Sequence, residues 1–273
     1  MVDESIKGLC AALAILAACH KKPEALVASG SAGSGSSAPV VAVGSGGGSA
    51  VPGPSVDPGK VLDDALAKDH VAADAVKKRI VAPASAWAVI ASKTNDASEV
   101  TELEVIAGRA DGGVAEIRLV PPTGGKGTFD GVESLEAKDL EGDGAEEGLL
   151  VVGWTRDIRV PGSDADSFVM TTEEAKQLYV LVGHPPALRV AFTHIVSYKT
   201  NSEGMPEDNP TPYAGDEEVT YDWSIAPGKP AAIKLTRTKS EVADKDRLKG
   251  VLDPATDPLF SAGSGETVPL GLK

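Results

Sequence analysis

The chain has 273 residues, of which 42% are apolar and only 4% aromatic. This composition excludes a collagen-like, coiled-coil or fully disordered protein, and it predicts a core built from Val, Leu, Ile and Ala. The formal charge of -14 opposes binding to phosphate backbones, because such binding depends on Lys and Arg displacing counterions. No nucleic-acid partner is therefore expected.

The first predicted element is an apolar stretch from Gly8 to Ala18, which is followed by Cys19 and His20. It is too short to cross a bilayer, which takes about 20 helical residues, but it suits the apolar region of a signal peptide. A buried helix at the start of a cytosolic domain is the alternative. The Gly- and Ser-rich composition that follows favours the signal peptide.

The segment Leu16-Ala17-Ala18-Cys19 resembles the lipobox of bacterial lipoproteins. The resemblance implies that residues 1–18 are a signal peptide cut off by signal peptidase II. It also implies that Cys19 is lipidated with diacylglycerol and an acyl chain such as palmitate, which would make a stable membrane anchor. By the same resemblance, His20 rather than Asp after the lipidated cysteine implies the outer membrane.

Cysteine usage agrees with a lipoprotein. The chain has two cysteines, Cys10 in the predicted signal peptide and Cys19 at the predicted lipidation site. The mature chain would then have no free thiol and no disulfide. This excludes thiol catalysis and cysteine-ligated zinc.

A linker is predicted next, over residues 19–56. From Ser29 to Ser55 the chain is almost entirely Gly, Ser, Ala, Val and Pro. Such a segment has too few large apolar groups to offset the entropy lost on ordering. Residues 24–56 are therefore expected to be disordered and to serve as a flexible tether.

A folded domain is predicted from Asp57 to the end of the sequence, and it opens with a helix. Asp57-Pro58 has the form of an N-cap followed by proline at the first helical position. Apolar residues then recur at three- and four-residue steps with one wider gap, which predicts an amphipathic helix over about 58–80. These residues are Leu62, Leu66, Ala73, Val76 and Ile80.

Beyond Pro83 the apolar period changes to two, which is typical of half-buried antiparallel strands. The expected fold is mainly β, an antiparallel and sandwich-like sheet, with a short helical turn capped by Thr171-x-x-Glu174. The predicted strands are 87–92, 103–107, 115–119, 149–154, 178–182, 188–198, 219–225 and 231–237.

One loop has the residue types of a calcium site. Between strand-like flanks the sequence reads DLEGDGAEE, with Gly at the sixth position. Ca²⁺ takes six to eight oxygen ligands, so alternating acids on a tight turn have the right chemistry. The candidate ligands are the carboxylates of four residues and one backbone carbonyl: Asp139, Glu141, Asp143, Glu147 and the carbonyl of Ala145.

This segment resembles the calcium loops of FG-GAP and VCBS-type repeats, which bind the ion between two strands. A single copy is present, so the resemblance does not extend to the propeller fold of that family. An EF-hand is disfavoured because Leu150 stands at position 12, where a bidentate Glu is needed. An acidic, solvated hairpin turn without an ion is the open alternative.

Motifs for catalysis are sparse. The sequence has no G-x-S-x-G elbow and no H-E-x-x-H helix. His194 falls on the apolar face of the predicted strand 188–198, which favours a half-buried, hydrogen-bonded histidine in the core over a catalytic base.

The sequence therefore predicts a non-catalytic, membrane-anchored envelope protein that binds calcium and a protein or polysaccharide partner. The alternative is an envelope hydrolase with an unrecognised site.

Overall fold

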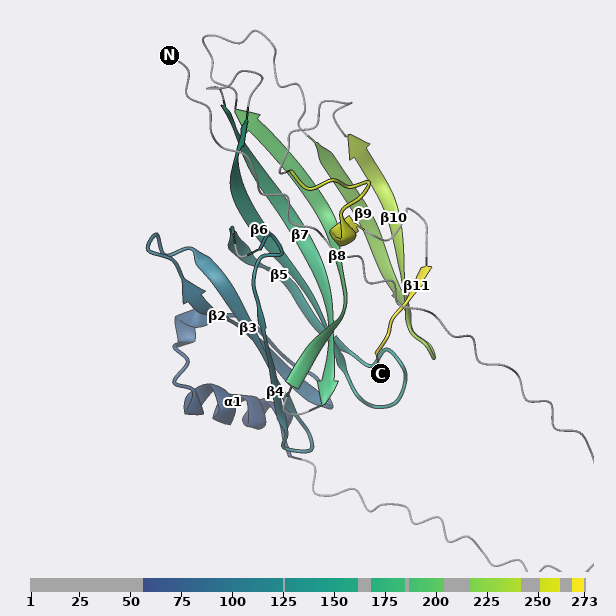
Figure 1. Cartoon of the computed structure of the whole chain (residues 1–273). Coiled ribbons are helices and arrows are strands. Elements are labelled where there is room, and N and C mark those ends of the chain that lie inside the picture. The colour runs from purple at the N-terminus through teal and green to yellow at the C-terminus, as the bar shows by residue number, and fades with distance from the viewer. Residues whose placement is uncertain are drawn as a thin grey trace, which may run out of the picture. The chain divides into compact units, whose positions relative to one another are not determined.

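The computed structural model in Figure 1 describes the part of the chain that begins at Val56. The predicted signal peptide, Cys19 and almost all of the linker lie outside the described residues. Every described residue belongs to one compact unit. The described residues are 56–124, 126–161, 168–184, 187–203, 217–241, 251–260 and 267–272.

Strands take up 62% of the residues that the structure describes, which confirms the mainly-β class. They form one 11-stranded sheet in the order β1-β2-β3-β5-β6-β7-β8-β9-β10-β11, and β4 pairs with β3. All pairs are antiparallel except one parallel bridge between β4 and β8. The bounds are β1 Val76–Val81, β2 Ser85–Thr94, β3 Val100–Arg109, β4 Val114–Leu119, β5 Thr128–Lys138, β6 Glu147–Pro161, β7 Phe168–His184, β8 Ala187–Glu203, β9 Glu218–Ala226, β10 Ala232–Glu241 and β11 Thr267–Pro269.

Each of the eight segments predicted as strands overlaps a strand of the sheet, so these predictions are confirmed. In β9 the predicted alternation holds, because Val219 and Tyr221 are buried while Asp222 and Ser224 are exposed. The capped helical turn predicted at Thr171-x-x-Glu174 is wrong. Those residues lie inside β7, where ladder pairing with both β6 and β8 satisfies the backbone and overrides the local capping pattern.

The N-terminal helix is shorter than the sequence predicts. Helix α1 spans Pro58–Lys68, and Asp57 caps it as expected, since its Oδ1 accepts a hydrogen bond of 2.9 Å from the Gly59 N–H. The chain turns after Lys68, where His70 adopts a positive φ of 54°. Residues 76–81 form strand β1 instead. Val76 and Ile80 fit a period of two as well as a period of 3.6. Because these residues pair with β2, they form a strand and not a helix.

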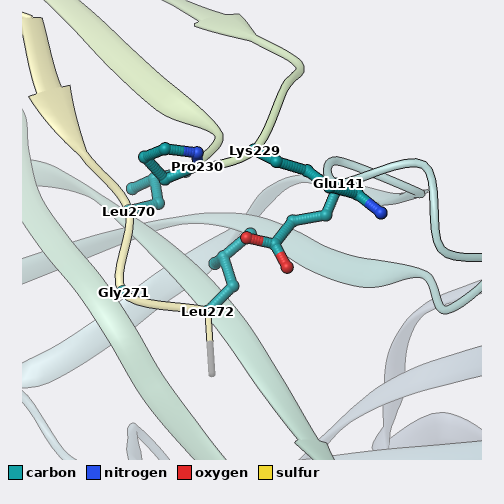
Figure 2. Close-up of a pocket in the computed structure, with 6 residues that line it drawn as sticks. All are labelled: Glu141, Lys229, Pro230, Leu270, Gly271 and Leu272. Atoms are coloured by element: carbon teal, nitrogen blue, oxygen red, sulfur yellow. The ribbon is translucent and has the colours of Figure 1, made fainter. Parts of the chain in front are cut away.

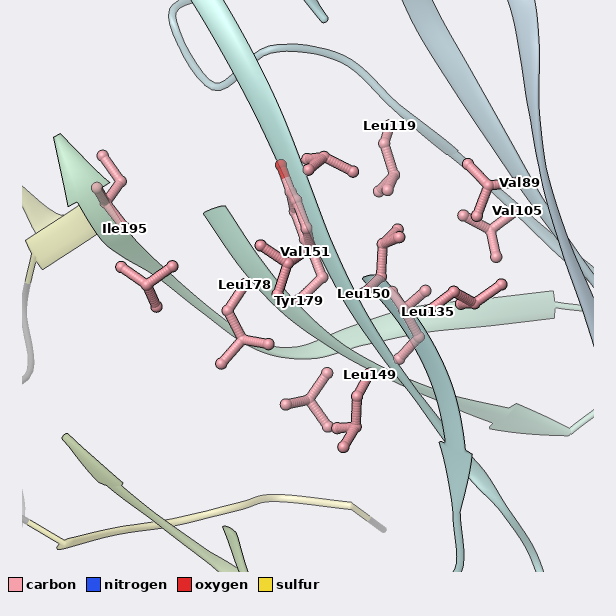
Figure 3. Close-up of a cluster of buried hydrophobic side chains, with 14 of the residues drawn as sticks. Val89, Val105, Leu119, Leu135, Leu149, Leu150, Val151, Leu178, Tyr179 and Ile195 are labelled. Carbon is pink, nitrogen blue, oxygen red and sulfur yellow. The ribbon is translucent and has the colours of Figure 1, made fainter. Parts of the chain in front are cut away.

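The main core lies where the sheet curls around its own apolar side chains. Figure 3 shows Val89 and Val105 of the early strands close to Leu135 and Leu150 of β5 and β6, with Leu178 of β7 further along. Because residues from β2 to β10 belong to the same buried cluster, burying them ties the whole sheet into one unit.

Helix α1 covers the other face of β2 and β3. Leu62 of the helix belongs to a second buried cluster with Ala88 and Ile106. Gly108 makes this packing close, because a Cβ at this position would lie 2.8 Å from the Leu62 backbone nitrogen. With both faces covered, β2 is buried continuously from Ser85 to Ile90.

Candidate functional site

The acidic loop is the connection from Asp139 to Glu146 between β5 and β6. Asp139 organises it. The Oδ1 atom of Asp139 accepts hydrogen bonds from the N–H groups of Gly142 (2.6 Å) and Asp143 (3.1 Å), and its Oδ2 atom accepts one from Gly144 (2.9 Å). Gly142 and Gly144 both have positive φ, 68° and 87°, which favours glycine at these two positions.

These contacts determine the protonation of Asp139. The backbone N–H of Gly144 lowers the pKa of Asp139 below its ordinary value, and those of Gly142 and Asp143 act in the same direction. The positive charge of Lys229, from the turn between β9 and β10, lowers it further. Asp139 therefore carries its negative charge at neutral pH while it holds the loop together.

Glu147 closes the loop from the opposite end. Its side chain is buried, with 7% of the residue exposed, and its Oε2 atom accepts a hydrogen bond of 2.9 Å from the Leu140 N–H. Burial raises the pKa of Glu147, and the nearby charges of Asp143 and Asp139 add to the rise. Asp139 and Asp143 thus lie close enough to Glu147 for their negative charges to repel it.

Of the remaining predicted ligands, Asp143 is exposed, whereas Glu141 and Ala145 are half-buried. The Oδ1 atom of Asp143 accepts a hydrogen bond of 2.9 Å from the Ala145 N–H. Glu141 instead lines a groove with Lys229 (Figure 2). Across the part of the chain that is described, no group of three or more His, Cys, Asp or Glu is arranged to hold a metal ion. Calcium binding stays a prediction.

Glu146, the last residue of the loop, ties it to the start of β2. Its Oε2 atom accepts hydrogen bonds from the Ser85 hydroxyl (2.6 Å) and the Ala84 N–H (3.2 Å). The Ser85 oxygen in turn accepts one of 2.8 Å from the Trp87 indole N–H. No sequence pattern indicated this contact, because it joins two segments that are about sixty positions apart.

A buried polar network in β6, β7 and β8 is the second cluster of chemistry-bearing groups. Glu173 has no exposed surface, and its Oε1 atom accepts hydrogen bonds from the Tyr198 hydroxyl (2.7 Å) and the Leu252 N–H (2.9 Å). Its Oε2 atom pairs with the guanidinium of Arg156. This network fastens residues 251–260 to the sheet.

The sequence analysis missed Glu173, although the signal was present. Thr171, Glu173, Ala175 and Gln177 alternate with polar neighbours and continue into Tyr179, all on the buried side. A strand extended back from the predicted 178–182 would have placed Glu173 in the interior.

His194 lies where the sequence predicted it. It is buried at 1% exposure, its Nδ1 atom is 2.5 Å from the Ile195 carbonyl oxygen, and its ring packs edge-on against Tyr221. The prediction of a hydrogen-bonded histidine in the core is confirmed. None of the described helices is long and apolar enough to cross a membrane.

Comparisons with models of protein families, with characterised proteins and with solved structures find no match to this chain.

Proposed function

We propose that the chain is a lipoprotein of the bacterial envelope, anchored through Cys19, whose sandwich-like β body is a non-catalytic binding module. The Leu16 to Cys19 sequence supports the anchor, and the Gly- and Ser-rich residues 24–56 support a flexible tether. The body has its own core and its own helix cap at Asp57, so it does not need the preceding residues for packing.

One observation favours a binding module over a hydrolase. Among the described residues, three carboxylates that stand near other ionisable groups already bind groups of the protein itself: Asp139 holds loop amides, Glu146 holds Ser85, and Glu173 holds Arg156 and Tyr198. A general acid or base must instead reach a substrate proton. These side chains are therefore best explained as structural.

Calcium is part of this proposal. Its ligands would be the carboxylates of Asp139, Glu141, Asp143 and Glu147 and the carbonyl of Ala145. The tight turn at Gly142 and Gly144 and the mutual repulsion of the acids support an ion there. Glu141 would have to turn from the groove toward the loop. The bound partner would be an envelope protein or polysaccharide.

The anchor is tested by metabolic labelling with radioactive palmitate. Wild type should take up label, and the Cys19→Ala variant should accumulate as an unlabelled precursor. A Cys10→Ala variant is the matched control and should label like wild type. Equal labelling of the wild-type chain and the Cys19→Ala variant would rule out the anchor. Recovery of the wild-type chain in inner-membrane fractions would contradict the outer-membrane assignment alone.

The tether is tested by brief proteolysis of the membrane-bound protein. Cleavage within residues 24–56 should release a resistant fragment that begins close to Asp57, because the cap and the core start there. A protected linker would show that this segment packs against another surface.

A further inference from the structure

A groove is formed where three segments distant in sequence meet. It is lined by Glu141 of the acidic loop, by Lys229 and Pro230 of the turn between β9 and β10, and by Leu270–Leu272 of the C-terminal segment (Figure 2). Its volume is about 350 Å³, at the small end of the range of ligand pockets.

The walls of the groove are held by hydrogen bonds to the rest of the fold. The Gly228 N–H donates to the Leu140 carbonyl oxygen (3.0 Å), which joins the β9–β10 turn to the acidic loop. The Leu270 N–H donates to the Ala231 carbonyl (2.7 Å), and the Arg189 guanidinium donates to the Gly271 carbonyl (2.9 Å). The groove is therefore formed before any ligand arrives, which lowers the entropic cost of binding.

The groove combines apolar surface with one negative and one positive side chain. Pro230, Leu270 and Leu272 supply apolar surface, while Glu141 and Lys229 place one negative and one positive side chain at its border. No ion pair within 4.0 Å joins these two side chains among the described residues. Figure 2 shows the Glu141 carboxylate directed toward the C-terminal segment, with the Lys229 side chain running along the loop.

We propose that this groove binds a short peptide with free ends and apolar side chains. The peptide ammonium would face Glu141, its carboxylate would face Lys229, and its side chains would cover Leu270 and Leu272. Charge complementarity selects this occupant, because a ligand with an ammonium and a carboxylate matches both opposite charges of the groove, whereas a neutral apolar ligand matches neither and a singly charged ligand only one. The proposal rests on the body being a binding module, and it does not depend on the anchor. Glu141 cannot serve the groove and the proposed calcium site at once, so binding is measured in EDTA.

The test is equilibrium dialysis of labelled leucylleucine against the full chain in lipid nanodiscs, with empty nanodiscs as the blank. The groove is open, so we expect a dissociation constant on the order of 1 mM. N-acetylated and C-amidated forms of the same peptide should each bind more weakly. Absence of binding by leucylleucine, or equal binding of the blocked forms, would overturn the proposal.

Variants locate the site. Glu141→Gln and Lys229→Met should each weaken binding by about two- to fivefold, as expected for one exposed charge pair. Glu136→Gln and Lys93→Met remove matched exposed charges outside the groove and should bind like wild type. If all four variants bind equally, the peptide lies elsewhere and the proposal is wrong. Palmitate labelling tests the anchor separately, so a failure of one does not count as a failure of the other.

Discussion

Glu173 of β7 and Arg156 of β6 face each other as direct cross-strand partners and form a buried ion pair. Removing one member of a buried pair leaves the other charge without compensation in a medium of low polarity. The Tyr198 hydroxyl and the Leu252 N–H also bond to Glu173, so the carboxylate satisfies three separate groups.

We therefore expect Glu173→Ala to lower the free energy of unfolding by about 3–5 kcal/mol. Urea unfolding of the soluble fragment 57–273 measures this loss. The matched control is Glu174→Ala, the exposed neighbour on the same strand, which should change stability by less than about 0.5 kcal/mol. Equal small effects for both variants would show that the pair contributes no stability.

Calcium should raise the melting temperature of the same fragment. An ion that binds only the folded form adds about 2.7 kcal/mol at 100 times its dissociation constant. Without a bidentate Glu at position 12 we expect weak binding, with a dissociation constant of about 10⁻⁴ to 10⁻³ M.

The melting temperatures measured in millimolar Ca²⁺ and in EDTA should differ, and Asp143→Ala should remove the difference. Asp222→Ala, an exposed acid of β9, should keep it. If the wild-type melting temperature does not respond to Ca²⁺, the loop is an acidic turn without an ion.

Stability should also fall at alkaline pH. Burial raises the pKa of Tyr179 and of Tyr198 above the ordinary value of 10.0, and for Tyr198 the neighbouring Glu173 adds to the rise. A raised pKa means that the folded state retains the proton. The stability that a buried tyrosine hydroxyl contributes is therefore complete below pH 10. It is lost as the pH rises toward the pKa of the tyrosine in the folded state. Denaturant melts between pH 9 and pH 11 should show the decline, and Tyr179→Phe should reduce it. A decline as steep in Tyr179→Phe as in wild type would exclude Tyr179 as a cause.

Gly148 of β6 should not tolerate a side chain. A Cβ at this position would lie 2.7 Å from the Cζ3 atom of Trp87, which is itself buried. Gly148→Ala should cost about 1–3 kcal/mol through overpacking. Gly131→Ala is the control in the neighbouring strand, because a Cβ there meets nothing within 4 Å. Comparable unfolding free energies for the two variants would mean that Trp87 moves aside at little cost.

Local periodicity was sufficient to predict most of the sheet. Strands such as β9 bury one face, so alternation alone identifies them. Local periodicity failed at β1, because Val76 and Ile80 satisfy both the helical and the strand period. Only pairing with β2 determines that this segment is a strand. Periodicity also missed β5, because the alternation there is shifted by bulges after Phe129 and Val132.

The site was predictable only in part. Spacing alone indicated that Asp139 and Glu147 belong to one loop, and the structure brings both to it. The same spacing could not show that Glu141 and Lys229 line one groove, since that arrangement depends on where the β9–β10 turn lies. Contacts of this kind are properties of the tertiary fold.

The hydrogen bond from the Arg109 guanidinium at the end of β3 to the Gly183 carbonyl near the end of β7 links positions 74 residues apart. The single bridge between Glu116 and Ala187 is another such link, and most contacts within the body join positions distant in sequence, so its contact order is high. Chains with many such non-local pairings fold slowly, on the scale of milliseconds to seconds, because distant segments must meet before their contacts stabilise anything. The β7–β8 hairpin and the β2–β3 hairpin each need only local closure, so both would form early, and the contacts between them would form last.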